Sequence, residues 1–191
     1  MNRVAMMFVP AAVLIPLAFL FMSGNAGCPK VPTMTWAQAC LESSDTPSLY
    51  NMCGEILEHA PDTAEVTVYA LVAAMATKES SDTTGAEAES ELIHGSPSGD
   101  EKAALQRCVY ECSTARVLML RIISDLTNCQ FKDTEQEYVH AGAALETCAD
   151  VLSTKFPGSS VVAMVAADRD KAMVARTLGA IVLSHYKQLE I

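Results

Sequence analysis

The most constraining feature of this chain is a run of apolar residues that recurs at alternating spacings of three and four over residues 105–126. The positions are Leu105, Cys108, Cys112, Ala115, Met119, Ile122 and Leu126. Because an α-helix turns once every ~3.6 residues, this spacing places all seven side chains on one face of a single long helix. An isolated helix of this kind gains most of its stability from packing, so the face must be covered by other apolar surface.

Three other segments have the same rhythm and can supply that cover. They are Val66, Tyr69, Ala73 and Ala76; Tyr138, Ala141, Leu145, Cys148 and Leu152; and Ala172, Ala175, Gly179, Val182, Tyr186 and Leu189. Only 6% of the residues are aromatic, and Ala, Leu, Met and Glu are abundant, which favours helices over strands. The sequence therefore predicts an all-α fold, an up-and-down four-helix bundle.

The segments between these stripes predict how the helices are connected. Asp62 with Glu65, and Thr134 with Glu137, resemble capping boxes that begin the first and third helices. Residues 80–99 are rich in Ser, Thr, Gly, Asp and Glu, and we interpret them as a linker, although residues 86–93 could form one or two polar helical turns. Residues 127–133 are short enough to make the second and third helices antiparallel neighbours. Ahead of the bundle, residues 36–41 and 47–59 predict a helical hairpin extension.

The first 26 residues are typical of a secretory signal peptide. Arg3 precedes an uncharged apolar run over residues 4–22, and the small residues Gly24 and Ala26 suit cleavage after Ala26. An uncleaved membrane anchor is the alternative, and the prolines within the run favour the signal peptide. We expect residues 27–191 to be secreted as one bundle domain with no membrane contact after cleavage.

Charge restricts the class of partner. The chain has 13 Lys and Arg against 23 Asp and Glu, a net charge of -10. Nucleic acid and anionic lipid are negatively charged and would be repelled by such a surface, so neither is expected as the main partner. A basic or neutral partner fits better.

Seven cysteines in a secreted chain are candidates for disulfides. Cys108 lies early in the second long helix and Cys148 late in the third, as a bond between antiparallel helices requires. However, counting a rise of ~1.5 Å per residue from the hairpin places Cys112 nearer the level of Cys148. Cys28 and Cys129 could pair with each other, pair with outside thiols, or stay free.

Residues of catalytic type form no constellation in the sequence. The histidines at 59, 94, 140 and 185 are scattered, and there is no nucleophile elbow, phosphate loop or zinc signature. We therefore predict no enzyme activity, no metal and no cofactor. The charged run at residues 168–171 is interpreted as a solvated helix face, and Tyr138 and Tyr186 as packing residues.

Three short stretches carry a family resemblance. They are residues 50–53 (YNMC), 102–108 (KAALQRC) and 143–150 (AALETCAD), in that order behind the leader. This pattern resembles the plant invertase and pectin methylesterase inhibitor family over essentially the whole mature chain. The resemblance implies a disulfide-stapled four-helix bundle with an N-terminal helical hairpin. It also implies the pairs Cys40 with Cys53 and Cys108 with Cys148, and Cys112 falls where members often have Tyr.

The resemblance further implies a function. Family members are secreted to the apoplast or the vacuole and block the active-site cleft of a pectin methylesterase or an acid invertase. The esterase inhibitors cover the cleft with bundle helices, whereas the invertase inhibitors insert a hairpin loop that carries Pro-Lys-Phe. The alternative is a secreted binding or structural module on the same scaffold that inhibits nothing.

The equivalent hairpin loop here consists of Gln130, Phe131, Lys132 and Asp133. An exposed aromatic side chain next to a cation on a rigid loop could plug a carbohydrate-enzyme cleft, so we predict these residues as a target-binding loop. The alternative is that Phe131 folds back to cap the bundle and that Lys132 is solvated.

Overall fold

A computed structural model of the chain describes residues 28–187, so the predicted signal peptide over residues 1–26 lies outside the described part. The elements in chain order are β1 (Thr33–Thr35), α1 (Trp36–Ser43), α2 (Pro47–Leu57), β2 (Thr63–Glu65), α3 (Val66–His94), α4 (Gly99–Asn128), α5 (Thr134–Lys155) and α6 (Val161–Lys187). Over residues 28–187, no helix is both long enough and apolar enough to span a bilayer.

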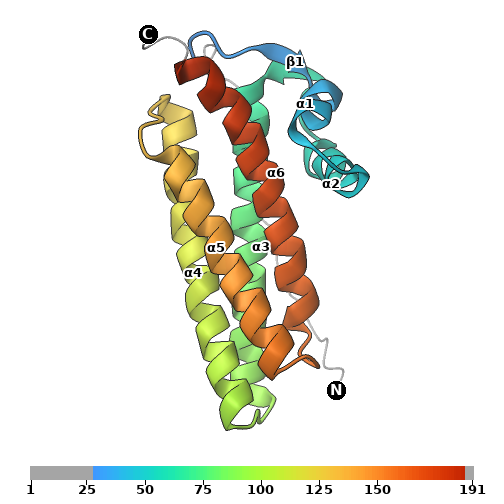
Figure 1. Cartoon of the computed structure of the whole chain (residues 1–191), viewed down its shortest axis with the longest axis vertical. Coiled ribbons are helices and arrows are strands. Elements are labelled where there is room, and N and C mark those ends of the chain that lie inside the picture. Colours follow the sequence, from blue (N-terminus) through green and yellow to red (C-terminus); the bar gives the residue numbers. More distant parts are fainter. Residues whose placement is uncertain (1–27, 188–191) are drawn as a thin grey trace, which may run out of the picture.

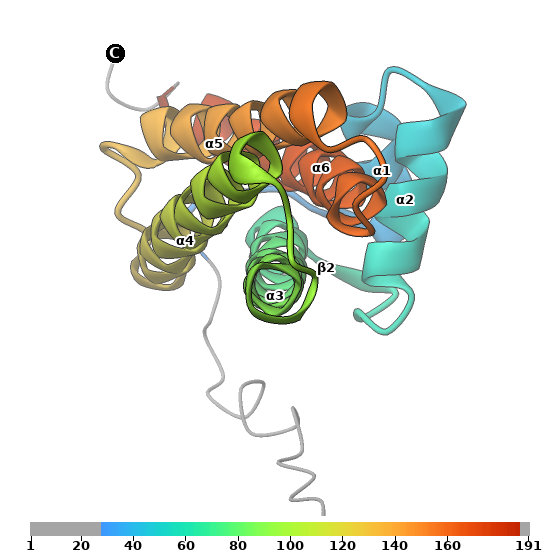
Figure 2. The same ribbon diagram turned by 90° about the horizontal axis from the view of Figure 1, so that it is seen from below.

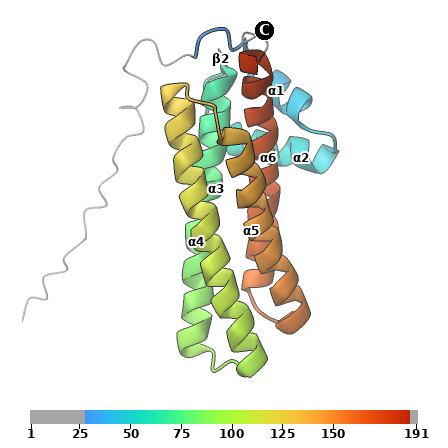
Figure 3. The ribbon, with the colours of Figure 1, turned by 60° about the vertical axis from the view of Figure 1, so that its left-hand side comes forward.

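Helices α3 to α6 run up and down alongside one another as a four-helix bundle (Figure 1). Viewed from below, their four ends enclose a common centre (Figure 2). The short helices α1 and α2 form a hairpin that packs against α6 and α3, away from α4 (Figure 3). The predicted all-α bundle with an N-terminal helical hairpin is confirmed.

The apolar stripes of α4 and α5 form the centre of the bundle. All seven stripe residues of α4 and all five of α5 are buried. On α6 the stripe residues Ala172, Ala175, Gly179 and Val182 are buried, Tyr186 is half-buried, and Leu189 lies outside the described residues. Gly179 lies so close to the ring of Tyr138 that a Cβ atom at this position would overlap it. Periodicity thus located the core faces of these three helices.

Helix α3 contradicts the prediction of a linker over residues 80–99. It is one helix of 29 residues that ends at His94. Thr77, Ser81 and Thr84 are buried on its inner face, and the hydroxyl of Ser81 donates to the carbonyl of Thr77 at 2.9 Å. The small side chains of this face allow close approach to the neighbouring helices, and the buried hydroxyls of Thr77 and Ser81 are satisfied by carbonyls one turn earlier in the helix. The Ser-, Thr- and Gly-rich composition of residues 80–94 is typical of a loop, but these residues form a helix.

Both predicted capping boxes are wrong. Asp62 precedes strand β2, and Glu65 is the last residue of that strand and the N-cap residue of α3, with no side-chain cap bond. Thr134 instead donates its hydroxyl to Oδ2 of Asp125 at 3.0 Å. The boxes that do form lie at α1, where Thr35 pairs with Gln38, and at α4, where Glu101 accepts from the backbone N–H of Ser98 at 2.7 Å.

A two-stranded antiparallel sheet joins the hairpin extension to the bundle. Strands β1 and β2 pair with Thr33 opposite Glu65 and Met34 opposite Ala64. The buried Tyr69 places its hydroxyl 3.0 Å from the carbonyl oxygen of Met34. The sequence did not predict these strands because three residues are too few to show a two-residue period.

Three disulfides crosslink the described chain. Cys40 is bonded to Cys53 within the α1–α2 hairpin, and Cys108 is bonded to Cys148 between α4 and α5. Cys28 is bonded to Cys129, which ties the start of the described chain to the α4–α5 connection. Cys112 is a buried free thiol. The register suggested by rise counting, Cys112 with Cys148, is therefore not the bonded one.

Candidate target-binding surface

The α4–α5 connection is held rigidly by its own backbone and by a disulfide. Helix α4 ends at Asn128, and the backbone of its C-cap residue Cys129 is left-handed, with φ 55° and ψ 40°. The N–H of Gln130 donates to the carbonyl of Asp125 at 2.9 Å, which closes the turn. The bond from Cys129 to Cys28 and the Thr134–Asp125 hydrogen bond then fix both sides of the connection.

The aromatic residue of this connection is not exposed as predicted. Phe131 is only 6% exposed, and its ring packs edge-on against Tyr186 of α6 at a centroid distance of 5.1 Å. Its ring is covered because the turn at Cys129 directs it back over the end of the bundle. Gln130, Lys132 and Asp133 are the exposed residues of the loop. The structure therefore matches the alternative in which Phe131 caps the bundle.

Large apolar side chains are instead exposed on the outer face of α4. Tyr110 is 62% exposed and Val117 is 41% exposed, and their spacing of seven residues places them on the same side of the helix. The guanidinium of Arg107 lies over the ring of Tyr110 at 5.5 Å. Exposed Tyr and Arg side chains of this kind are frequent anchors of protein interfaces. The outer face of α4 is thus the strongest candidate for contact with a protein partner.

A groove of about 450 Å³ runs beside these two residues, between α4 and α5. It is lined by Tyr110, Ser113, Thr114, Val117, Leu118, Arg121 and His140. Its lining contains Arg121 and His140, which can carry positive charge, and no carboxylate. The chain as a whole has a net charge of -10. The groove is therefore chemically distinct from the acidic remainder of the molecule. We call Tyr110, Val117, Arg121 and His140 the α4–α5 face.

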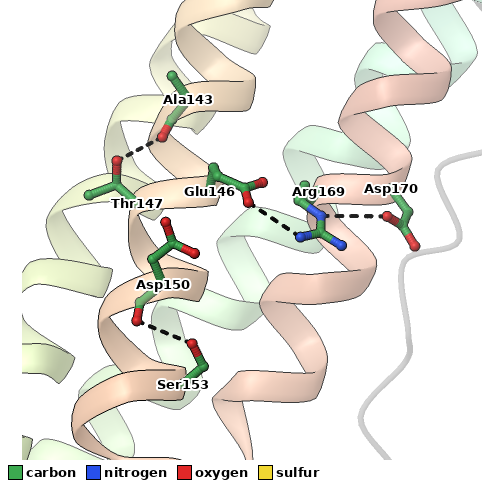
Figure 4. Close-up of polar contacts among 7 residues, drawn as sticks. All are labelled: Ala143, Glu146, Thr147, Asp150, Ser153, Arg169 and Asp170. Atoms are coloured by element: carbon green, nitrogen blue, oxygen red, sulfur yellow. Dashed lines mark hydrogen bonds and ion pairs between the residues drawn. The ribbon is translucent and has the colours of Figure 1, made fainter.

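The neighbouring surface between α5 and α6 is polar. Figure 4 shows Glu146 of α5 reaching toward Arg169 of α6, whose guanidinium also approaches Asp170. The two N–O distances are 3.4 Å and 3.7 Å. Exposed ion pairs of this length contribute little to stability. They do satisfy the charges on this side of the bundle.

The charged run at residues 168–171 does not form a solvated face throughout. Asp168 is fully buried, and it accepts a hydrogen bond from the hydroxyl of Ser80 on α3. Lys171 donates to the same Ser80 oxygen at 2.7 Å. Burial raises the pKa of Asp168, and the hydroxyls of Ser80 and Thr84 and the charge of Lys171 oppose this rise. The prediction was wrong because it counted charges without locating the inner face of α6.

The histidines remain apart in the structure. His59 is exposed just after α2, and His94 and His140 are exposed on α3 and α5. His185 is half-buried near the end of α6. Within residues 28–187, the side chains of metal-ligating type that gather closely are Cys108, Cys112 and Cys148. Two of these three are joined in a disulfide.

The sequence contained a signal for the α4–α5 face, which lies outside the core stripe of α4. Tyr110 and Val117 are apolar residues that lie off the core stripe of α4 and on its opposite side. Large apolar residues in such positions are exposed in a bundle, and when several gather they mark interaction sites.

Comparison with known proteins identifies the architecture. No family model matches the sequence. No curated protein matches it either. A solved structure of a pectin methylesterase inhibitor from Arabidopsis, in a mutant form, superposes with a TM-score of 0.64 at 17% sequence identity, covering 76% of this chain and 95% of that chain. The described part of this chain therefore has the fold of a pectin methylesterase inhibitor, in agreement with the resemblance carried by its sequence motifs.

Proposed function

We propose that this protein is a secreted inhibitor that blocks the active-site cleft of a cell-wall carbohydrate-active enzyme and performs no chemistry of its own. Its likeness to a pectin methylesterase inhibitor supports this function. Three disulfides are typical of proteins that work outside the cytosol, which supports secretion to the apoplast.

Between the two enzymes implied by the sequence motifs, we propose a pectin methylesterase as the target. The observation that carries this choice is the burial of Phe131 against Tyr186. An inhibitor that inserts its hairpin loop needs an exposed plug, and this loop offers only Gln130, Lys132 and Asp133. Covering the cleft with helices, the mode attributed to the esterase inhibitors, requires no such plug.

The α4–α5 face is the surface that we propose for this contact. Tyr110 supplies a large, exposed ring that is already oriented by Arg107. Val117 extends the apolar surface, and Arg121 and His140 provide hydrogen-bond donors at the edge of the groove. An apolar centre with a polar rim is the usual organisation of a protein interface.

An inhibition assay with the purified, oxidised protein tests the proposal. We expect stoichiometric loss of pectin methylesterase activity and no effect on an acid invertase. Tyr110→Ala should weaken inhibition at least tenfold, because a central aromatic anchor contributes roughly 2 kcal/mol or more. Val117→Asp should weaken it too, whereas Leu41→Asp, at an exposed apolar residue of α1, should leave it unchanged.

The possible failures have different meanings. Inhibition of the invertase alone would refute the choice of target. If neither enzyme were inhibited, the alternative of a non-inhibitory binding module on this scaffold would replace the proposal. Equal effects of Val117→Asp and Leu41→Asp would refute the α4–α5 face as the contact surface.

A further inference from the structure

Helices α4 and α5 bring three sulfur atoms together in the core. The Sγ atoms of Cys108, Cys112 and Cys148 all lie within 4.8 Å of one another. Cys108 and Cys148 form a disulfide, and Cys112 is a buried thiol. Cys112 follows Cys108 by four residues, so both side chains lie on the same face of α4. A free thiol therefore lies beside a disulfide that it could attack.

We propose that these three cysteines form a thiol–disulfide exchange site, through which the crosslink between α4 and α5 passes from Cys108 to Cys112. The thiol of Cys112 loses its proton, and the thiolate attacks Sγ of Cys148. The bond between Cys112 and Cys148 forms as the bond between Cys108 and Cys148 breaks. Cys108 leaves as a thiolate and takes up a proton. The number of disulfides is unchanged, so neither an oxidant nor a reductant is consumed.

The second crosslink fits the same pair of helices. The Sγ atoms of Cys112 and Cys148 lie within 4.8 Å of each other even while Cys148 is bonded to Cys108, so the new bond needs only a short movement of the side chains. On the side of α3, the residue next to Cys112 is Gly85, where an added Cβ would lie 3.4 Å from the Cβ of Cys112. The glycine leaves space beside Cys112, in which this side chain can adjust during exchange.

The surroundings of Cys112 control how fast the exchange can occur. Burial raises the pKa of the Cys112 thiol to about 12, and the carboxylates of Asp168 on α6 and Glu111 on α4 add to this rise. The adjacent groove also contains Asp82 and Glu89 of α3 and Arg116 of α4. On α5 the facing group is Cys148, which does not titrate while it is bonded. Since only the thiolate attacks a disulfide, exchange should be slow at neutral pH and faster in alkali.

The first test removes the present partner of Cys148. We expect secreted, oxidised Cys108→Ser protein to contain a Cys112–Cys148 bond, detected by mass spectrometry of peptides alkylated without reduction. Cys112→Ser should keep the Cys108–Cys148 bond, and the variant with both substitutions should have Cys148 as a free thiol. Alkylation of both Cys112 and Cys148 in Cys108→Ser, with the Cys40–Cys53 bond intact, would overturn the proposal.

The second test follows exchange in the unmodified protein, so it does not depend on the folding of a variant. Samples are held at pH 7 or pH 9.5, quenched in acid, unfolded and alkylated, and the label is located by peptide mapping. We expect labelled Cys108 to accumulate at the expense of labelled Cys112, more than tenfold faster at pH 9.5, at a rate independent of protein concentration. A label that stays on Cys112 at both pH values would overturn the proposal.

Discussion

Helices α3 and α4 are almost the same length, at 29 and 30 residues, and pack against each other, yet they bury different kinds of side chain. After Tyr69, every buried side chain of α3 is Ala, Ser or Thr. Helix α4 buries Leu, Met, Ile and two cysteines, one of which is crosslinked to α5. The inner face of α3 thus consists mostly of small, partly polar side chains, whereas the inner face of α4 consists mostly of larger apolar ones.

The comparison shows two ways to keep a long helix in a core. Helix α4 removes a large apolar area from water, which stabilises it directly. Helix α3 buries mostly smaller side chains, and polar contacts also link it to α4 and to the start of α6. Its Glu91 accepts from the hydroxyl of Ser159 at 2.7 Å and from the N–H of Ser160 at 2.9 Å, just before α6. Its Asp82 pairs with Arg116 of α4 at 2.8 Å.

Among changes to the inner faces of α3 and α4, the largest effect on stability is expected from removing the crosslink between α4 and α5. Cys148→Ser opens a loop of 40 residues and also abolishes the alternative bond to Cys112. In the chain-entropy account, this lowers the free energy of unfolding by about 4 kcal/mol. Urea unfolding of the oxidised protein measures the change. Cys40→Ser opens a loop of only 13 residues and should cost about 3 kcal/mol. A larger loss for Cys40→Ser would contradict this order.

The next effect contrasts the two inner faces directly. Leu105→Ala removes a fully buried side chain from α4 and should cost about 3 kcal/mol through lost burial and the cavity left behind. Ser81→Ala removes a buried hydroxyl from α3 that bonds within its own helix, and it should change stability by less than about 1 kcal/mol. Both variants are compared with the parent protein by urea unfolding. Equal losses would remove the distinction between the two helices.

A third prediction concerns the buried carboxylate that α6 places against α3. Burial raises the pKa of Asp168 in the folded protein, so the folded state keeps its proton to higher pH than the unfolded chain does. As pH rises above about 4, the ordinary pKa of Asp, the folded state therefore loses stability relative to the unfolded state. Asn at this position cannot ionise and avoids this loss.

We therefore expect the stability of Asp168→Asn relative to the parent protein to increase between pH 4 and pH 7, and to stay constant below pH 3. Urea unfolding of both proteins across this range gives the difference. Asp170→Asn, at the exposed neighbour, serves as the control and should show no comparable trend. A relative stability of Asp168→Asn that fell with rising pH would show that the folded state favours the ionised carboxylate.

The same contrast explains what the sequence could predict. Large apolar residues at helical spacing identified the inner faces of α4 and α5, because those residues have few other favourable places. The inner face of α3 has the same spacing but consists of Thr77, Ser81, Thr84 and Ala88. These small residues also occur in loops, so composition concealed a helical pattern that was present in the sequence.

The candidate site was less predictable for a different reason. The ring of Phe131 is covered by Tyr186, which lies far along the chain, and its loop is anchored by the bond between Cys28 and Cys129. Neither contact has a local signal. The sequence motifs implied that residues 130–133 lie in a hairpin loop, and they do, but the direction of the aromatic ring is set by tertiary packing.

The smallest predicted effect is a gain in stability within α3. Gly85 lies inside this helix, where Gly costs roughly 1 kcal/mol relative to Ala. An added Cβ would lie 3.4 Å from the Cβ of Cys112, an ordinary contact, so Gly85→Ala should raise the free energy of unfolding by about 0.5 kcal/mol. Urea unfolding of the oxidised protein, with Gly142→Ala as an unhindered helical control on α5, measures the gain. If Gly142→Ala stabilises the protein and Gly85→Ala destabilises it, the packing of α3 against α4 requires the space beside Cys112. The close approach of the two helices would then depend on a glycine at position 85.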